Sequence, residues 1–141
     1  MAEHTPNGLL IKQIHDRLEK QSNNILRDKD LTMAQVFVLI VLQKAVNQQL
    51  SMKELERHFG VAQSTIAGII SRLEQKGLVE AFGDTTDKRI KLVHITPAAE
   101  ACCAEADCHM KGVEQMLLQG FSKEEREMFN VLLTKAANNL K

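Results

Sequence analysis

The feature that most constrains the fold of this chain is a pair of short helical patterns separated by a single glycine. Ser51 and Glu54 form a capping-box pattern, in which a serine at the helix cap is followed three residues later by a glutamate. The helix that starts there is expected to end at Gly60, because glycine readily takes the left-handed conformation that ends many helices. A second helix is expected over residues 63–76, where isoleucine and leucine recur at helical spacing.

A ribbon of two strands is expected directly after the second helix. Residues 79–82 and 89–95 are rich in β-branched and other apolar residues, and residues 83–88 form the turn between them. Two helices joined by a tight turn and followed by such a ribbon make a winged helix-turn-helix, an architecture that usually binds duplex DNA. The order of these patterns therefore predicts both a fold and a class of partner.

Long helical patterns flank the winged segment on both sides. An amphipathic helix is expected from residue 7 to about residue 27, and Thr32 is a candidate cap for a helix that is apolar on nearly all sides. Such a helix is expected to be buried at the centre of the fold. Thr96 and the proline after it begin a long helix to about residue 118, and a capping box at Ser122 starts the last helix. The predicted fold class is mainly α with a small β-wing.

Length, charge and hydropathy limit the classes of function. A chain of 141 residues fits one domain, and its zero net charge argues mildly against a partner as acidic as DNA. Residues 51–96 hold seven Lys and Arg against six Asp and Glu, so a positive surface must come from the arrangement of the charges. The longest apolar run, residues 36–42, is too short to span a bilayer. Because the N-terminus is polar and shows no signal pattern, we expect the chain to be cytoplasmic, with no membrane partner.

The outer face of the predicted helix at residues 63–76 has an unusual composition. Its apolar face holds Ile66, Ile69, Ile70 and Leu73. The opposite face and its flanks hold Ser64, Thr65, Ala67, Gly68, Ser71, Arg72 and Gln75. A solvated face favours good helix formers, whereas small residues let a backbone approach another surface, and Ser and Thr can bond to base edges and phosphates. This face therefore favours a helix in a major groove; the alternative is an ordinary exposed face that tolerates small residues.

Charged residues occupy the predicted tip of the ribbon. A cation such as Lys88 or Arg89 can enter a minor groove, where the potential of DNA is most negative. Asp87 would repel phosphate, so we expect it to hold Arg89 or Lys88 in position through a charged hydrogen bond. Alternatively, the tip is a solvated turn of mixed charge, as most such turns are.

Three motifs follow one another along the chain: LTMAQVFVL at residues 31–39, QSTIAGIISRLEQKGLV at residues 63–79 and DTTDKRIKLVHIT at residues 84–96. The first is similar to the second-helix pattern of the MarR family of bacterial transcriptional regulators, and the second is similar to the recognition helix of that family. The third is similar to its wing, where Asp-x-Arg-Asp-x-Arg is the usual form. In this order and in a chain of this length, the resemblance is specific and covers nearly the whole sequence.

The resemblance implies a homodimer of a single MarR-type domain, residues 1–141. A winged helix-turn-helix at about residues 30–96 would lie between dimerisation helices at residues 7–28 and 97–140. The family implies a repressor that binds a pseudo-palindrome in double-stranded DNA and is released by a small aromatic ligand or by cysteine oxidation. By resemblance and from the helical wheel, the expected DNA-binding residues are Gln63, Ser64, Thr65, Gly68, Ser71, Arg72, Lys88 and Arg89, with Asp87 as a wing-positioning residue.

Two positions depart from the family pattern. Thr86 stands where an arginine is common, so the wing holds less charge and is expected to bind more weakly. Ala62 stands where a serine or aspartate cap is common, which puts the start of the recognition helix in question and costs about 1 kcal/mol of capping. Neither departure removes the module.

Cysteines and histidines are candidates for regulation. On a helical wheel, Cys102 belongs to an apolar stripe and is expected in the core, together with Ala98, Ala106, His109, Val113 and Leu117. Cys103 and Cys108 point in other directions and are the better candidates for redox sensing, because reactivity requires exposure. No two cysteines share a face, which disfavours a disulfide within the helix. The five histidines show no close ligand spacing, so we expect no metal site, although one assembled across a dimer stays open.

Other functions remain to be weighed against DNA binding. A winged-helix interaction module that has lost DNA binding is the main alternative, supported by the neutral charge and by Thr86. The sequence shows no nucleophile–base pair, no glycine-rich phosphate loop and no paired carboxylates in an apolar context, so we expect neither an enzyme nor a cofactor. An effector pocket, if present, is expected where the helices at residues 7–27, 33–46 and 97–118 meet the winged module.

Overall fold

The chain folds into six α-helices and one small sheet over residues 4–141, which the computed structural model describes. The helices are α1 (Asn7–Leu26), α2 (Met33–Lys44), α3 (Met52–Phe59), α4 (Gln63–Gln75), α5 (Pro97–Leu117) and α6 (Lys123–Asn139). The strands are β1 (Gln49–Ser51), β2 (Val79–Gly83) and β3 (Lys91–Ile95). The predicted helices and the mainly α fold class with a small β-wing are confirmed. The first three residues of the polar N-terminal stretch lie outside the described residues.

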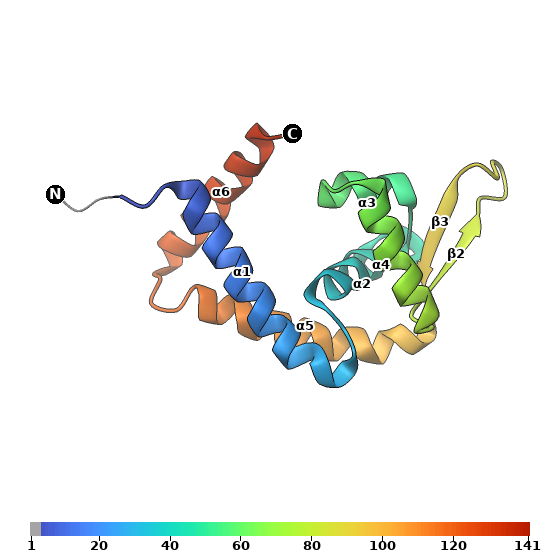
Figure 1. Cartoon of the computed structure of the whole chain (residues 1–141), viewed down its shortest axis with the longest axis horizontal. Helices are drawn as coiled ribbons and strands as arrows, with labels where there is room; N and C mark the ends of the chain where they lie inside the picture. Colours follow the sequence, from blue (N-terminus) through green and yellow to red (C-terminus); the bar gives the residue numbers. More distant parts are fainter. Residues whose placement is uncertain (1–3) are drawn as a thin grey trace.

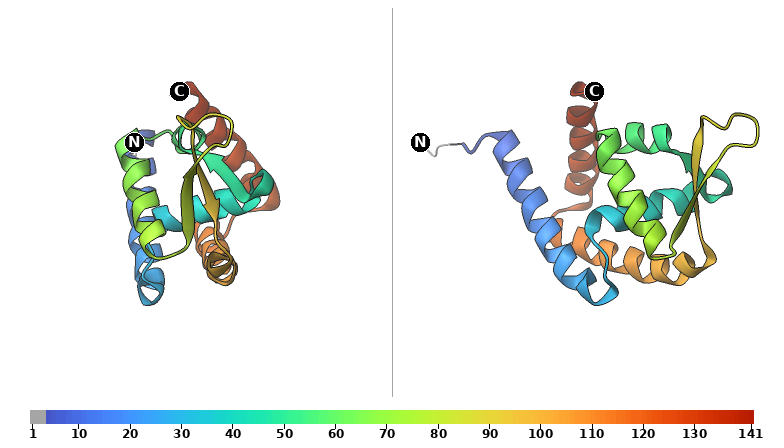
Figure 2. Two further views of the ribbon diagram at one scale, coloured as in Figure 1. Left: turned by 90° about the vertical axis from the view of Figure 1, so that its right-hand side faces the viewer. Right: turned by 45° about the vertical axis from the view of Figure 1, so that its right-hand side comes forward.

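The molecule consists of a winged helix-turn-helix body and a helical arm. The helices α2, α3 and α4 and the sheet form the body, while α5 runs beneath it towards α1 and α6 at the other end of the molecule (Figure 1). The β2–β3 ribbon projects from the body on the side away from α1 and α6 (Figure 2). Among the described residues, no helix is both long and apolar enough to cross a membrane.

The helix α2 lies at the centre of the core. Its buried residues are Met33, Gln35, Val36, Val38, Leu39 and Leu42. A complete capping box starts the helix: Gln35 N donates to Thr32 Oγ1 at 3.3 Å, and Thr32 N donates to Gln35 Oε1 at 3.2 Å. The prediction of a central buried helix with Thr32 as its cap is confirmed, although Ala34, Lys44 and Phe37, which is 38% exposed, face solvent.

The sheet has three antiparallel strands in the order β1-β3-β2. In the β2–β3 pair, Val79 lies opposite Ile95, and both side chains are buried together with Val93. The sequence does not predict β1, because its three residues show no strand pattern and pair only with the distant strand β3. Its last residue, Ser51, also caps α3.

The second strand of the ribbon begins at Lys91 rather than at residue 89. The tip closes through two backbone hydrogen bonds, from Ile90 N to Asp87 O at 3.0 Å and from Asp84 N to Ile90 O at 2.9 Å. These bonds make a turn of the residues just before β3, so regular pairing starts one residue after Ile90.

The buried stripe of α5 differs from the stripe that the sequence predicts. Ala99, Cys103, Ala106 and Val113 are buried, whereas Cys102 is half-buried. The prediction that Cys102 lies in the core is therefore wrong, and so is the exposure expected for Cys103. Both possible stripes contain Ala106 and Val113, so the helical period alone does not separate them. The packing of α5 against α1 and α2 decides which one is buried.

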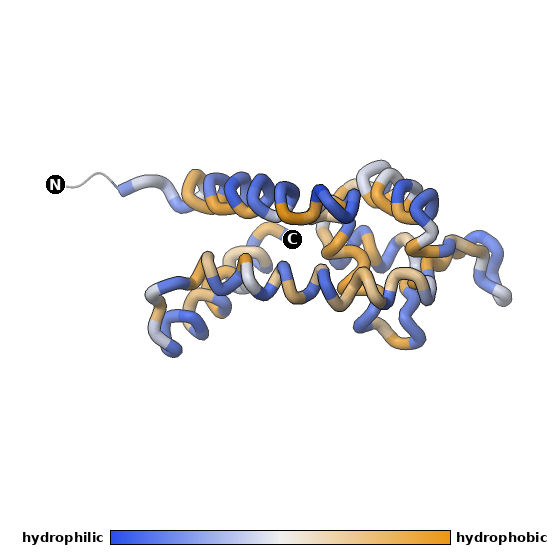
Figure 3. The backbone as a smooth tube through the Cα atoms, turned by 90° about the horizontal axis from the view of Figure 1, so that it is seen from below, coloured by the Kyte–Doolittle hydropathy of each residue, from blue (hydrophilic) through white to orange (hydrophobic). Residues whose placement is uncertain are grey.

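The arm carries apolar surface that this chain does not cover. Although a capping box at Ser122 starts α6, none of its residues 123–139 is buried. Figure 3 shows apolar segments along α1 and α6. The exposed apolar residues of these helices include Leu9, Leu10, Ile11, Ile25, Met128, Val131, Leu132 and Leu133. Apolar surface of this extent indicates a protein–protein contact.

Two matched substitutions test the central position of α2. Val36→Ala removes methyl groups from a fully buried side chain, and we expect a decrease of roughly 2 kcal/mol in the free energy of unfolding from reduced burial and the cavity left behind. Val46→Ala makes the same change at a side chain that is 84% exposed and should cost less than about 0.5 kcal/mol. The measurement is urea unfolding at equal protein concentration. Equal decreases would contradict the burial of α2.

Candidate nucleic-acid interface

The turn between α3 and α4 sets the position of the second helix. Glu54 N donates to Ser51 Oγ at 3.1 Å and so starts α3, as the capping-box pattern predicts. Gly60 ends α3 with a φ of 63° and donates from its N–H to Glu56 O at 2.9 Å. A side chain is strained at this φ, whereas glycine is not. With Leu55 and Ile66 fully buried, the two helices share the core and the outer face of α4 is left in solvent.

The expected DNA-binding residues of α4 lie together on one exposed face. Ile66, Ile70 and Leu73 are buried and Ile69 is half-buried, which places the outer face where the wheel predicts it. The residues exposed on that face are Gln63, Ser64, Thr65, Gly68, Ser71 and Arg72. A Cβ at Gly68 would meet no other atom within 4 Å, so packing within residues 4–141 does not require a glycine there. A partner surface that approaches α4 closely would require a glycine at this position.

The start of α4 has no side-chain cap. Ala62 occupies the cap position and makes no side-chain hydrogen bond, yet the helix begins at Gln63. Thr65 N and Ile66 N donate to Ala62 O, which accounts for two of the N–H groups of the first turn. The exposed N-terminus of α4 therefore presents amide donors and the positive end of the helix dipole to a ligand, a combination that suits phosphate.

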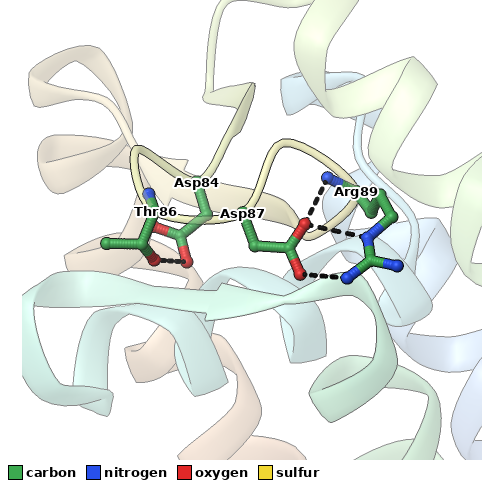
Figure 4. A network of polar contacts seen from close by, with 4 residues as sticks. All are labelled: Asp84, Thr86, Asp87 and Arg89. Carbon is green, nitrogen blue, oxygen red and sulfur yellow. Dashed lines mark hydrogen bonds and ion pairs between the residues drawn. The ribbon is translucent and has the colours of Figure 1, made fainter.

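At the wing tip, Asp87 holds Arg89 by three hydrogen bonds (Figure 4). Asp87 Oδ1 accepts from Arg89 N at 3.0 Å and from Arg89 Nε at 3.1 Å, and Asp87 Oδ2 accepts from the Arg89 guanidinium at 3.1 Å. The bond from the Arg89 side chain lowers the pKa of the Asp87 carboxyl below its usual value. Of the two cations that Asp87 was expected to hold, the structure selects Arg89. The Arg89 side chain remains 91% exposed, so it is oriented and still accessible.

Two further contacts shape the wing. Thr86 donates to Asp84 from its backbone N–H at 3.4 Å and from its hydroxyl at 3.0 Å, so the residue that replaces the usual arginine serves the turn itself (Figure 4). Ala81 N donates to Glu74 Oε2 at 3.1 Å and thereby joins β2 to α4. The sequence does not single out Glu74, because its partner lies outside its own helix.

The structure gathers the predicted site residues into two groups. One group lies on the outer face of α4, and the other comprises Asp87, Lys88 and Arg89 at the wing tip. Within residues 4–141 no hydrogen bond or ion pair joins the two groups. An extended partner that meets both would contact a helix face and a hairpin tip at the same time.

The chain is similar to known proteins along nearly its whole length. The model of the MarR family matches residues 29–90. The multiple antibiotic resistance protein MarR of Salmonella typhimurium is 29% identical over 136 residues, which cover 94% of this chain and 92% of that protein. The chain is therefore similar to MarR-family proteins.

Solved structures agree with this similarity. Bordetella bronchiseptica BpsR, studied for the regulation of its DNA binding by 6-hydroxynicotinic acid, superposes with a TM-score of 0.85 at 26% identity, covering 97% of this chain and 98% of its own. A mutant of E. coli MarR in complex with operator DNA gives a TM-score of 0.81 at 27% identity, covering 92% of this chain and 91% of its own. S. aureus MepR bound to DNA gives a TM-score of 0.89, and at 21% identity it shows the fold alone.

Taken together, these similarities identify the chain as a DNA-binding transcriptional regulator. The alternative of an interaction module that has lost DNA binding is not favoured, nor is the cysteine-oxidation alternative.

A hollow of about 450 Å³ opens near the end of α4. It lies between the end of α1, the start of α2 and the last turns of α4. An effector pocket was expected where the helices now seen as α1, α2 and α5 meet the winged module; the lining of this hollow includes residues of α1, α2 and α4 but none of α5. That an effector binds there stays a prediction.

The three cysteines of the chain differ in accessibility. Cys103 is buried, and burial raises the pKa of its thiol to about 11, with the charges of Cys102, Glu100 and Asp107 adding to the effect. A thiol with that pKa holds little thiolate at neutral pH and reacts slowly. Cys108 is exposed, so of the two redox candidates only Cys108 has the accessibility that the role requires.

Three exposed side chains on α1 bring potential metal-ligating atoms within 4.8 Å of one another: His15, Asp16 and Glu19. Asp16 already pairs with Lys12 at 2.6 Å, and His15 lies 3.3 Å from Glu19. These are ion pairs one helical turn apart on a solvated surface, and we assign no metal to them.

The difference between Cys103 and Cys108 is testable by alkylation. At neutral pH we expect iodoacetamide to modify Cys108 readily and to leave Cys103 unmodified, because Cys103 is both buried and protonated. Peptide mass spectrometry locates the label, and the urea-unfolded chain should label at all three cysteines. Cys108→Ser should remove the rapid iodoacetamide labelling, while Cys103→Ser should leave that rapid labelling unchanged. Labelling of Cys103 at the rate of Cys108 would contradict the assignment.

Proposed function

We propose that this regulator acts as a homodimeric repressor, with one winged helix-turn-helix of each subunit on each half-site of a pseudo-palindromic operator. One observation carries the proposal: an exposed face of small residues on α4 occurs together with a wing whose Arg89 is held in position by Asp87. Duplex DNA is a partner that uses both features, a helix in the major groove and a cation in the minor groove.

The residues of the two groups take different roles in the proposed complex. On α4, Gln63, Ser64, Thr65 and Ser71 bond to base edges and phosphates, and Gly68 allows the helix to come close. Arg72 pairs with the phosphate backbone. On the wing, Lys88 and Arg89 approach the minor groove, and Asp87 acts through the position of Arg89.

A second copy of the chain is the proposed cover for the apolar surface of the arm. The single domain of residues 1–141 then comprises a DNA-binding module at about residues 30–96 and dimerisation helices at residues 7–28 and 97–140. The exposed apolar side chains of α1 and α6 support this division, because these helices bury little within one chain. Two modules held by one dimer would explain a two-fold-symmetric operator.

A small aromatic effector is the proposed signal for release from DNA. BpsR, whose DNA binding is regulated by 6-hydroxynicotinic acid, supports this class of ligand. The place of action is the cytoplasm, where bacterial DNA is found. The proposed role is regulatory and not catalytic.

Selection from a pool of random duplexes at two salt concentrations tests the proposal directly. We expect enrichment of a two-fold-symmetric site with half-sites about one helical turn apart, and binding that weakens steeply with salt. Size measurement of the complex should give two chains per duplex. An enriched site without symmetry would contradict the dimer, and the absence of salt-dependent enrichment would contradict operator binding.

Arg89→Ala tests the role of the wing. Because the guanidinium is a sequence-independent contact, we expect affinity for all duplexes to fall roughly tenfold, equivalent to about 1.4 kcal/mol. The slope of log affinity against log salt should shrink by about 0.9 for each phosphate that the variant no longer neutralises. Fluorescence anisotropy measures both, with Lys44→Ala, exposed at the end of α2, as the control outside the site residues and the proposed dimerisation helices. Reduced affinity with an unchanged slope would mean that Arg89 does not meet the phosphates.

A further inference from the structure

The strand β2 forms the open edge of the wing. In the order β1-β3-β2 it pairs with β3 on one side, and among residues 4–141 no strand lies on its other side. Two backbone bonds flank the β2–β3 pair, from Thr96 N to Leu78 O at 3.0 Å and from Asp84 N to Ile90 O at 2.9 Å. Because hydrogen-bonded pairs alternate along an antiparallel ladder, these bonds direct the amide of Ala81 away from β3 and towards the open edge.

Glu74 of the recognition helix is the partner of this edge amide. It lies in the last turn of α4, and its Oε2 accepts the hydrogen bond from Ala81 N at 3.1 Å. Within residues 4–141 this is the one side-chain hydrogen bond between α4 and β2. Without it, water would take the place of the carboxylate and β2 would lose a fixed point on the helix.

Other hydrogen bonds hold the root of the ribbon. Leu78 N donates to Leu73 O at 3.0 Å directly after the end of α4, and Thr96 Oγ1 donates to Gly77 O at 2.7 Å. These bonds fix where the ribbon starts, whereas Ala81 lies in the middle of β2 and nearer the tip. A two-stranded ribbon is only marginally stable by itself, so its direction depends on contacts beyond its root. The bond to Glu74 is such a contact.

The place of Glu74 makes its negative charge unfavourable for DNA binding unless the carboxylate serves another purpose. Glu74 is exposed and lies one helical turn after Ser71, beside the face of α4 that we assign to DNA. A free carboxylate there would repel phosphate. Both acids near the proposed interface instead accept hydrogen bonds from the chain, Glu74 from β2 and Asp87 from Arg89.

We propose that Glu74 is a positioning residue that sets the angle between the recognition helix and the wing, so that α4 and Arg89 reach one duplex at the same time. The effect on DNA rests on the proposed function, because it requires Arg89 to meet the minor groove. Asp87 orients the Arg89 side chain relative to the tip, and Glu74 orients the ribbon relative to α4. Loss of the Glu74 bond lets the tip take more directions, and Arg89 then meets the groove for less of the time.

Two substitutions of Glu74 separate positioning from charge. Glu74→Ala removes both the charge and the hydrogen-bond acceptor, whereas Glu74→Gln removes the charge and keeps an oxygen that can accept from Ala81 N. The matched control is Glu80→Ala, which removes an exposed carboxylate from β2 and leaves the Glu74 bond in place. With the duplex obtained by selection, we expect Glu74→Ala to lower affinity roughly threefold, within the usual net value of one hydrogen bond. Neither Glu74→Gln nor Glu80→Ala should lower it.

Fluorescence anisotropy with the full chain distinguishes the two roles. If Glu74 acts only as a charge, Glu74→Ala and Glu74→Gln both raise affinity because both remove a repulsion, and that result would overturn the proposal. An equal loss in both variants would overturn it as well, because the acceptor oxygen would then have no effect.

A double-variant cycle tests whether Glu74 acts through the wing. In a chain that already carries Arg89→Ala, we expect Glu74→Ala to cause no further loss of affinity, because the contact that it positions is gone. The full threefold loss in that background would show that Glu74 acts on DNA by another route and would overturn the proposal.

NMR of the full chain without DNA tests the positioning by itself. In Glu74→Ala we expect the Ala81 amide to exchange with solvent faster, on the order of tenfold, and the order parameters of residues 84–89 to fall. Glu80→Ala should leave both unchanged. Unchanged order at the tip in Glu74→Ala would overturn the proposal even if DNA affinity falls. If Arg89→Ala itself leaves affinity unchanged, the proposed role of the wing fails, and the NMR result still decides whether Glu74 positions it.

Discussion

The burial of α2 is the constraint on which the rest of the structure depends. This one apolar helix packs against α1, α4 and α5 and against the strands β1 and β3. It therefore orients the recognition helix, the root of the wing and the arm with respect to one another. Because protein interiors are close-packed, a displacement of α1 or α5 cannot be absorbed by empty space around α2 and must move its other neighbours. The capping box at Thr32 begins this helix at the same junction where Lys76 holds the end of α4.

Features that depend on neighbours in the sequence could be predicted, and features that depend on distant partners could not. The caps at Thr32, Ser51 and Ser122 involve side chains and amides three residues apart, so the sequence alone shows them. The strand β1 exists because β3 pairs with it, which no local pattern reveals. The exchange of Cys102 for Cys103 in the core has the same origin, since two stripes of α5 have a helical period and tertiary packing selects one.

The candidate interface also combines features that could be predicted from nearby residues with features that depend on distant ones. The outer face of α4 could be predicted because it lies opposite a clear apolar stripe, and the Asp87–Arg89 pair joins residues two positions apart. The bonds of Lys76 to Asp30 and Gln35 span 46 and 41 positions, and a lysine at the end of a helix is ordinarily a solvated residue. Its partial burial and its place beside Arg72 become visible only in the folded chain.

The neutral charge of the chain bears on how a small ligand could release it from DNA. Each phosphate neutralised by a protein contributes to both affinity and salt dependence, so one cation supplies a smaller share of the total in a protein that neutralises many phosphates. In this chain Thr86 takes the place of a wing arginine, and Asp87 offsets part of the charge of Arg89. The proposed complex therefore relies on few cations, of which Arg72 is one. Loss of that single contact would therefore remove a larger share of the binding free energy than it would in a strongly basic protein.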